Sequence, residues 1–312
     1  MLQGSHEGAA ARSFIQAPAT VPKSFTPCFC LLFQCKNGTI KIVFFYYEAY
    51  MQEHHQKTID NFINKVKSDN KYLAVILCGS IAQGLEKKES DIDVYLVVTD
   101  DEYEKAVAEL ATAYFNFEVS TYEGGYIDGK IINYDFLVKA KKFGSEPTRA
   151  SFIGAKDLWT KIDGLQMLID QIPIFDETCR EKKLQSFFAQ VFTWGQFFYE
   201  ESLAKNNLYL KQKSITETVF YGMRYVLEYN RILFPCHKSL FKYIEKAKHQ
   251  PTKFIELSQE LLSYGKKETM KEWLKVFYEF ADIKLDYGKC ISLFMENSEK
   301  DWVTNFVPIA NC

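Results

Sequence analysis

The sequence predicts an α+β protein in which a sheet with flanking helices is followed by an all-α part. In the first half, runs such as "YLAVILCG" and "DVYLVVT" are typical of buried strands and alternate with helical stretches. From Glu177 onward, apolar residues recur at helical spacing and no convincing strand follows. The change of period near residues 173–177 marks a domain boundary. We therefore expect a leader over residues 1–47, a sheet domain over 48–175 and a helical domain over 176–312.

The leader differs from the rest of the chain in composition. Its first 27 residues are small and polar, contain proline and lack periodicity, which predicts poor order. The following "CFCLLFQCKNGTIKIVFFYY" predicts a short hairpin around Asn37-Gly38, a strong two-residue turn signal. A start of translation at Met51 is the alternative interpretation of this region.

The sheet domain begins with an amphipathic helix over residues 48–68. Strands at 72–79 and 93–99 follow, and Asp100 or Asp101 then caps a helix over 102–115. The segment 117–140 contains two strand-like runs, with Gly124-Gly125 and Asp128-Gly129 as turn candidates. The helical domain is expected to contain helices within residues 182–204, 214–234, 239–248, 251–263 and 267–297.

Composition excludes several classes of protein. The formal net charge is -2 and the pI is near 6.3, so a global basic field for binding a polynucleotide is absent. No apolar run reaches the roughly 18 residues that a membrane-spanning helix needs. The eight cysteines form no dense framework, which favours reduced thiols and a cytoplasmic protein. Cys28, Cys30 and Cys35 are the one cluster, and their spacing does not favour zinc.

Two carboxylates open the second strand of the sheet domain. Asp91 and Asp93 are two residues apart, so in a strand they point to the same face about 6.6 Å apart at the backbone. Like charges on one face repel unless a cation lies between them. A pair of divalent ions roughly 3.5–4 Å apart suits this spacing, as in enzymes that displace phosphate esters in line. Mg²⁺ is the first choice because it prefers oxygen ligands, with Mn²⁺ as the second.

The turn after the first strand carries Gly79 and Ser80. Glycine lets the backbone approach a ligand, successive N–H groups can hold a phosphate, and the Ser80 hydroxyl can add a further hydrogen bond. Gly84 keeps the turn unobstructed. Taken alone, the pair is also consistent with an ordinary glycine-rich turn between two strands.

These residues carry a resemblance to a known family. Leu77-Cys78-Gly79-Ser80, a spacer of ten residues and Asp91-Ile92-Asp93-Val94 resemble the signature of the nucleotidyltransferase superfamily that includes DNA polymerase beta. Gly84 and Ser90 match the form seen in its small bacterial members. The segments "EPTRASFIGAKDLW" and "YNRILFPCHKSLFKYIEKA" are similar to those that join the catalytic and helical domains of kanamycin and lincosamide nucleotidyltransferases. The resemblance covers roughly residues 51–300 and implies a polymerase-beta-like catalytic domain.

In that family a third carboxylate on a neighbouring strand completes the metal site. Asp135 is the predicted third carboxylate, because "IINYDFLV" resembles a strand in which Asn133, Asp135 and Leu137 share a face. By resemblance it would be a metal ligand or the base that takes the acceptor's proton. Asp128 is the rival, but it precedes Gly129 and is better explained as a turn residue.

Second-line candidates surround these residues. Arg149 could reach nucleotide phosphates, or could be a surface arginine after a Pro-Thr helix start. Lys238, at the start of a helix, could supply positive charge opposite the metals. With Gly79, Ser80, Gly84 and Ser90, these two complete the predicted nucleotide-binding set.

The sequence therefore predicts a metal-dependent nucleotidyltransferase. It would transfer a nucleoside monophosphate, AMP from ATP first among them, to a hydroxyl on a small-molecule acceptor and release pyrophosphate. Two Mg²⁺ ions would be held by Asp91, Asp93 and Asp135. A nucleotide-binding or antitoxin-like partner-binding module without turnover, and a helical adaptor, are the alternatives. The acceptor, the preferred NTP and the oligomeric state stay open.

Overall fold

The computed structural model describes residues 29–34, 40–45, 51–303 and 308–311. By its internal contacts the chain divides into two compact units, Met1–Tyr50 and Met51–Cys312. In the first unit, strands β1 (Phe29–Gln34) and β2 (Ile40–Phe45) pair antiparallel, with Gln34 opposite Ile40. The predicted pair of strands is confirmed. The predicted turn at Asn37-Gly38 and the poor order expected before residue 28 lie outside the described residues.

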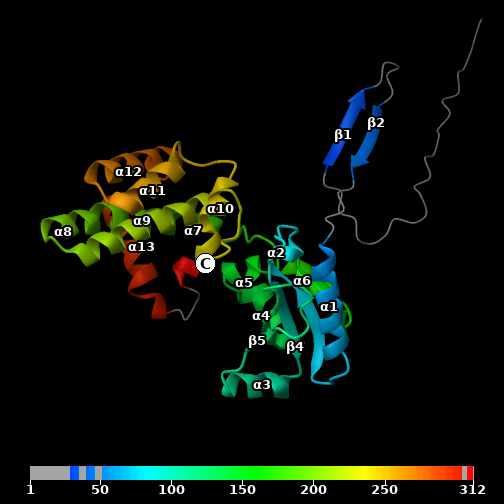
Figure 1. Ribbon diagram of the computed structural model, residues 1–312. Helices are drawn as coiled ribbons and strands as arrows, with labels where there is room; N and C mark the ends of the chain where they lie inside the picture. Colours follow the sequence, from blue (N-terminus) through cyan, green and yellow to red (C-terminus); the bar gives the residue numbers. More distant parts are fainter. Residues whose placement is uncertain (1–28, 35–39, 46–50, 304–307, 312) are drawn as a thin grey trace, which may run out of the picture. The chain divides into compact units, whose positions relative to one another are not determined.

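The second unit contains a five-stranded mixed sheet in the order β5-β6-β4-β3-β7. Figure 1 labels strands β4 and β5 of this sheet. Strands β4 and β6 are parallel, and the other neighbouring pairs are antiparallel. The strand bounds are β3 Tyr72–Leu77, β4 Ile92–Val98, β5 Ala113–Asn116, β6 Ile127–Ile132 and β7 Lys156–Thr160.

Helices cover both faces of this sheet, and the side chains of the central strands alternate between them. One face packs Val75, Leu77, Val94 and Leu96 against α1 (Glu53–Val66). The opposite face packs Ala74, Ile76, Tyr95 and Val97 against α4 (Tyr134–Phe143) and α6 (Leu165–Gln171). The shorter helices of this part are α2 Gly79–Ala82, α3 Asp100–Ala108 and α5 Glu146–Ala150. We call residues 51–171 the sheet region.

Two predicted elements of the sheet region are wrong. The helix expected over 102–115 ends at Ala108, because Leu110 adopts a positive φ of 55° and residues 113–116 pair with β6 as β5. The strand expected around Asp135 is the helix α4. It begins after Asn133, whose side-chain oxygen accepts the Phe136 N–H at 2.9 Å and caps the helix.

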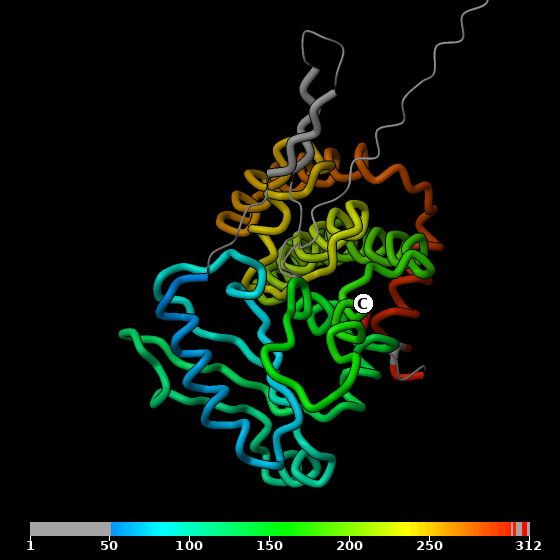
Figure 2. Tube along the Cα trace, turned by 90° about the vertical axis from the view of Figure 1, so that its right-hand side faces the viewer, coloured from blue at the N-terminus to red at the C-terminus, as the bar shows by residue number. Residues whose placement is uncertain are grey.

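Helices make up the rest of the second unit, and among the described residues after Thr160 no strand occurs. Their bounds are α7 Arg180–Phe192, a π-helix Thr193–Phe198, α8 Tyr199–Ala204, α9 Leu208–Tyr229, α10 Leu240–Glu245, α11 Phe254–Tyr264, α12 Lys267–Ala281 and α13 Tyr287–Ser298. Short 3₁₀ turns lie at His237–Ser239, Asp301–Val303 and Ile309–Asn311. We call residues 180–298 the helical region; Figure 2 shows its helices gathered into one bundle.

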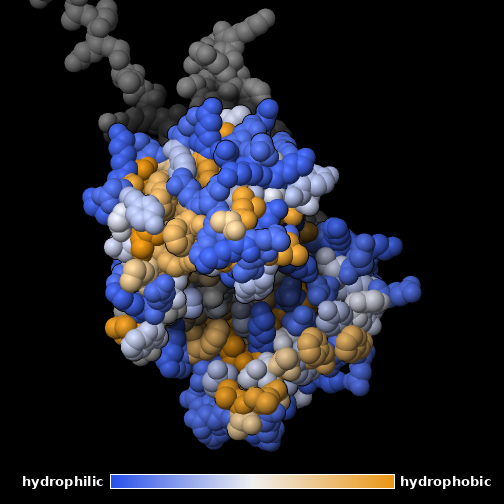
Figure 3. Space-filling view, turned by 90° about the vertical axis from the view of Figure 1, so that its left-hand side faces the viewer, coloured by the Kyte–Doolittle hydropathy of each residue, from blue (hydrophilic) through white to orange (hydrophobic). Residues whose placement is uncertain are grey.

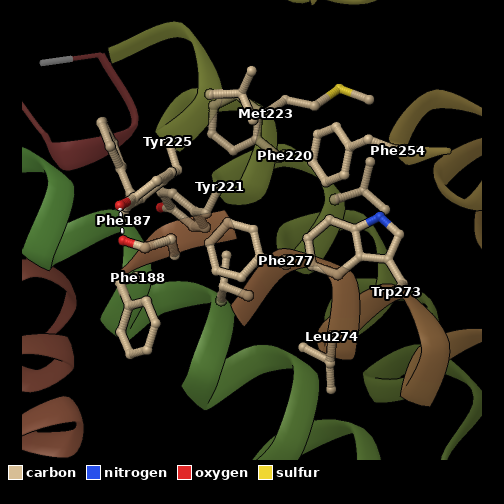
Figure 4. Close-up of a cluster of buried hydrophobic side chains, with 14 of the residues drawn as sticks. Phe187, Phe188, Phe220, Tyr221, Met223, Tyr225, Phe254, Trp273, Leu274 and Phe277 are labelled. Carbon is tan, nitrogen blue, oxygen red and sulfur yellow. Dashed lines mark hydrogen bonds between the residues drawn. The ribbon is translucent and has the colours of Figure 1, made fainter. Parts of the chain in front are cut away.

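Aromatic side chains fill the core of the helical region (Figure 4). Trp273 and Phe277 stack with ring centroids 5.4 Å apart, and Tyr225 meets Phe277 edge-on at 5.3 Å. The Tyr225 hydroxyl donates to the backbone carbonyl of Ala281, so this buried phenol is satisfied. The predicted α+β class, with a helical part after the sheet, is confirmed.

No helix in the described part of the chain is both long and apolar enough to cross a membrane. On the face shown in Figure 3, hydrophilic side chains predominate and hydrophobic ones form smaller groups between them.

Candidate active site

Three aspartates meet at one end of the central parallel strand pair. Asp93 on β4 is aligned with Asp128 on β6, and Asp91 lies directly before β4. Aligned residues on neighbouring strands point to the same face of a sheet, and so do residues two apart on one strand. One carboxylate oxygen from each residue lies within 4.8 Å of those of the other two. The strand register therefore creates the cluster, which we call the Asp triad.

Asp135 is not part of this cluster. It lies in the first turn of α4 with its side chain 56% exposed, and its Oδ2 is 2.6 Å from Lys139 Nζ. Because α4 follows the carboxyl end of β6, whereas Asp128 lies near the amino end, the length of the strand separates the two aspartates. Asp135 lines a different cavity, of about 250 Å³. The carboxylate that joins Asp91 and Asp93 is Asp128, the rival in the sequence analysis.

Burial and mutual repulsion make it unfavourable for all three carboxyl groups of the Asp triad to be ionised together. The pKa of Asp93 is raised to about 6 by burial first, and then by the charges of Asp91 and Asp128. Burial and the Asp91 charge raise the pKa of Asp128. Lys130 and Lys238 oppose the rise at Asp93 without cancelling it. Three carboxylate oxygens this close, with too little cationic charge around them, fit a divalent cation.

This electrostatic balance predicts how metal binding depends on pH. A cation binds the carboxylate form, so Asp93 must lose its proton, and binding competes with protonation below about pH 6. We expect the apparent affinity for Mn²⁺ to fall about tenfold between pH 7.5 and pH 5, with proton release on binding near pH 5.5. Calorimetric titration in two buffers of different ionisation enthalpy measures both quantities. An affinity independent of pH over this range would contradict a site built on Asp93.

The Gly79-Ser80 turn lies directly against the Asp triad. The Cys78 N–H donates to the Asp93 carbonyl at 2.9 Å, and Gly79 has a φ of 69°. A Cβ on Gly79 would lie 1.9 Å from Asp93 Oδ2. Only glycine allows both this backbone conformation and the close approach of the Asp93 carboxylate. Gly84 also has a positive φ, of 65°, in the turn that follows α2.

Gly79→Ala is expected to displace the Asp93 carboxylate and to abolish divalent-cation binding. The left-handed backbone alone costs about 1–2 kcal/mol for a residue with a Cβ, and the overlap with Asp93 adds to it. Gly124→Ala is the matched control, because Gly124 has a similar φ of 74° but open space around its Cβ position. Urea unfolding and Mn²⁺ titration of both variants separate the two effects. Equal losses of stability and of metal affinity in both variants would contradict the proposed contact.

The other predicted site residues have distinct surroundings. Ser80 lies part-exposed in the first turn of α2. Ser90 Oγ accepts the Lys87 N–H at 2.9 Å, so Ser90 orders the loop that leads into Asp91. Arg149 donates from Nε to the Ile172 carbonyl at 3.0 Å and from Nη2 to the Ile174 carbonyl. Its guanidinium therefore tethers the segment after α6.

Lys238 comes from the helical region and is exposed on the 3₁₀ turn that precedes α10. Its positive charge acts to lower the pKa of Asp93, and its predicted role as a cation opposite the metals stays a prediction. Two residues near the triad were missed by sequence reasoning. The Tyr126 hydroxyl donates to Asp91 Oδ2 at 3.2 Å, and Lys130 on β6 lowers the pKa of Asp93 and Asp128. Lys130 is two residues after Asp128, and this spacing on one strand was the sequence signal that could have placed both on the same face.

One known protein family matches the part of the chain that contains this site. Residues 59–179, which include the Asp triad, match the family described as nucleotidyltransferase domain. No curated protein sequence matches the chain. Among solved structures, a nucleotidyltransferase-like protein from Exiguobacterium sibiricum is similar with a TM-score of 0.43 and 11% sequence identity, over 80% of this chain and 78% of that one. The finer likeness to kanamycin and lincosamide nucleotidyltransferases stays a prediction. Residues 59–179 are therefore a nucleotidyltransferase domain, which confirms the superfamily predicted from the sequence.

Proposed function

We propose that the protein transfers a nucleoside monophosphate, AMP from ATP, to a hydroxyl group on a small-molecule acceptor and releases pyrophosphate. The observation that supports this most directly is the Asp triad, with Lys238 acting on it from the helical region. A cluster of carboxylates that feels the charge of a lysine suits a triphosphate held by divalent ions at one end and by that lysine at the other.

Each residue has a proposed role. Asp91 and Asp93 would hold two Mg²⁺ ions, and Asp128 would hold one of them or take the proton of the acceptor hydroxyl. This assignment replaces Asp135. When bound, the ions would neutralise the charge that develops on the transferred phosphoryl group. Gly79 and Ser80 would hold the triphosphate beside Asp93, and Lys238 would contact its outer phosphates.

The acceptor oxygen would attack the α-phosphorus in line with the departing pyrophosphate. The bond between the acceptor oxygen and phosphorus forms as the bond to pyrophosphate breaks. The proton of the hydroxyl passes to a carboxylate of the Asp triad. Asp128, the member of the Asp triad that comes from β6, is the carboxylate proposed to take it. The protein's contribution is to position the reactants in a fixed electrostatic environment.

The proposal of a small-molecule acceptor rests on the net charge of the protein. A formal net charge of -2 gives no basic field to hold a polynucleotide, so a small molecule is the proposed acceptor. Cys78, Cys179, Cys236 and Cys290 are free thiols, which is consistent with a cytoplasmic location.

The test measures pyrophosphate release with each of the four NTPs and Mg²⁺. Acceptors are supplied as a deproteinised small-molecule extract, as total RNA or as denatured protein. We expect release with ATP and the extract, and none with the Asp93→Asn variant. Release that depends on RNA or on protein would overturn the small-molecule acceptor. Binding of ATP without release under any condition would favour the alternative of a nucleotide-binding module.

A further inference from the structure

Lys238 lies on a segment that is anchored to the sheet region on both sides. The segment runs from Phe234, shortly after α9, to Tyr243 in α10, and Lys238 is exposed near its middle. An exposed lysine on a connecting segment loses much conformational freedom when it binds a phosphate. Contacts that fix the backbone beforehand lower that cost.

The first anchor is the carboxylate of Glu146, which belongs to α5 of the sheet region and is 2% exposed. Its Oε2 accepts the backbone N–H of Phe234 at 2.7 Å. The same oxygen is 3.2 Å from Arg224 Nη2 of α9, and Oε1 is 2.8 Å from Lys183 Nζ of α7. A single buried carboxylate thus joins α5, α7, α9 and the segment that carries Lys238.

Contacts between side chains connect Glu146 to the residue that precedes Lys238. The Arg224 guanidinium lies over the rings of both Phe187 and Phe234, 4.8 Å and 4.5 Å from their centroids. The Phe234 ring meets the His237 ring edge-on at 5.4 Å, and His237 directly precedes Lys238. Fixing the Phe234 ring therefore also restricts His237, the residue immediately before Lys238.

The second anchor lies beyond Lys238. The Tyr243 hydroxyl donates to Gln83 Oε1 at 3.3 Å. Gln83 ends α2, the helix that begins with Gly79 and Ser80. This contact ties α10 to the same turn that approaches Asp93.

Burying these charges is not explained by stability alone. Glu228 lies 3.9 Å from Lys183, so the cluster contains two carboxylates and two cations, all largely withdrawn from solvent. Buried ion pairs commonly contribute less to stability than apolar residues of similar size would. In some proteins such pairs instead serve to specify one arrangement, and here the contacts of Glu146 join the helical region to the sheet region.

We propose that Glu146 is a positioning residue for nucleotide binding, which fixes the backbone of the segment from Phe234 to Tyr243 and thereby the position of Lys238. Tyr243 assists it through Gln83. The inference rests on the proposed role of Lys238 at the triphosphate. Glu146 itself touches neither nucleotide nor metal.

The test uses Glu146→Gln and Tyr243→Phe rather than Glu146→Ala. Alanine would leave Lys183 and Arg224 buried without their shared carboxylate, and we expect that variant to unfold. Glutamine offers one oxygen where the carboxylate offered two, so Lys183 loses its acceptor if the amide nitrogen replaces Oε1, and Phe234 and Arg224 lose theirs if it replaces Oε2. Tyr243→Phe removes one hydroxyl and is expected to fold. Glu200→Gln is the matched control, since it removes the exposed ion pair with Lys267, 2.6 Å long, within the helical region.

The first readout is hydrogen exchange of residues 232–242 in the full chain without nucleotide. We expect exchange to rise about tenfold in Glu146→Gln, less in Tyr243→Phe and not in Glu200→Gln. The second readout is the Kd for ATP with Mg²⁺. We expect Glu146→Gln to weaken binding about as much as Lys238→Ala, roughly tenfold, and the double variant to bind no more weakly than either single variant.

Additive losses in the double variant, or unchanged exchange in both anchor variants, would overturn this inference while leaving the proposed function intact. A wild-type protein that binds no ATP would instead overturn the proposed function and, with it, the role of Glu146. Unchanged binding by Lys238→Ala, with tight binding by the wild type, would remove Lys238 from the site and likewise overturn the inference.

Discussion

Asp93→Asn is expected to abolish metal-dependent nucleotidyl transfer without destabilising the metal-free protein. Asparagine has nearly the shape of aspartate but lacks the charge that a divalent cation needs. The pKa of Asp93 rises from 3.8 to about 6 in the folded state, so its ionised form is disfavoured there. At neutral pH this corresponds to a cost on the order of 3 kcal/mol, which a neutral side chain would not incur.

The sign of the pH effect provides an independent check. A carboxyl whose pKa is raised by folding binds more protons in the folded than in the unfolded state between about pH 4 and pH 6. Its contribution to the free energy of unfolding therefore falls as the pH rises through this window. We expect the Asp93 contribution to the free energy of unfolding of the wild type to fall over this window. In Asp93→Asn the free energy of unfolding should depend less on pH. Urea unfolding from pH 4 to pH 8 measures both. A variant that retains full activity would refute the assigned site.

Asp128→Asn and Asp135→Asn are expected to have opposite outcomes. Asp128→Asn removes a member of the Asp triad and should lower the rate of transfer by at least about a hundredfold, the scale of losing a positioned acid-base or charge-stabilising group. Asp135→Asn removes only an exposed ion pair with Lys139, of a kind that contributes little to stability, and should leave the rate unchanged.

Steady-state kinetics of the two variants, with Mn²⁺ affinity measured in parallel, decides between the two aspartates. Both substitutions change one carboxylate to an amide, so each variant is the other's control. Loss of activity in Asp135→Asn with retention in Asp128→Asn would restore the assignment made from the sequence and contradict the one from the structure.

The sequence was sufficient to locate the Asp91 and Asp93 pair because their relation is local. Two residues on one strand share a face whatever the rest of the fold does. The central strands were equally recognisable, since β3 and β4 are apolar runs bounded by turn signals. The third carboxylate depends on which strand pairs with β4 and in which register, and a single sequence does not specify that.

Two local signals at the third carboxylate were misread. Asp128-Gly129 has the composition of a turn, but Gly129 lies inside β6, where a Cβ would be 3.1 Å from the Tyr114 side chain on β5. Glycine at this position serves close strand packing. Around Asp135, alternating apolar residues suggested a strand, although Asn133 as an N-cap with Lys141 and Lys142 in the last turn is a helix signal.

Contacts between segments that are distant in the chain could not be predicted from the sequence. Arg149 was a candidate for phosphate binding, yet it donates to two backbone carbonyls that follow α6. Glu146 and Phe234 are 88 residues apart, and no periodicity indicates that they share a hydrogen bond. Such contacts follow from how helices pack on a sheet, which depends on the whole core.

The measurement that tests the central claim most directly is thermal unfolding of residues 51–312 with each NTP, with and without Mg²⁺. The wild type is compared with an Asp91→Asn/Asp93→Asn double variant. A ligand at a hundredfold excess over its Kd stabilises the folded state by about 2.7 kcal/mol, which is readily observed. We predict a Mg²⁺-dependent shift that is largest with ATP and absent in the double variant. No shift with any nucleotide, or an equal shift in the double variant, would contradict a nucleotide site at the Asp triad.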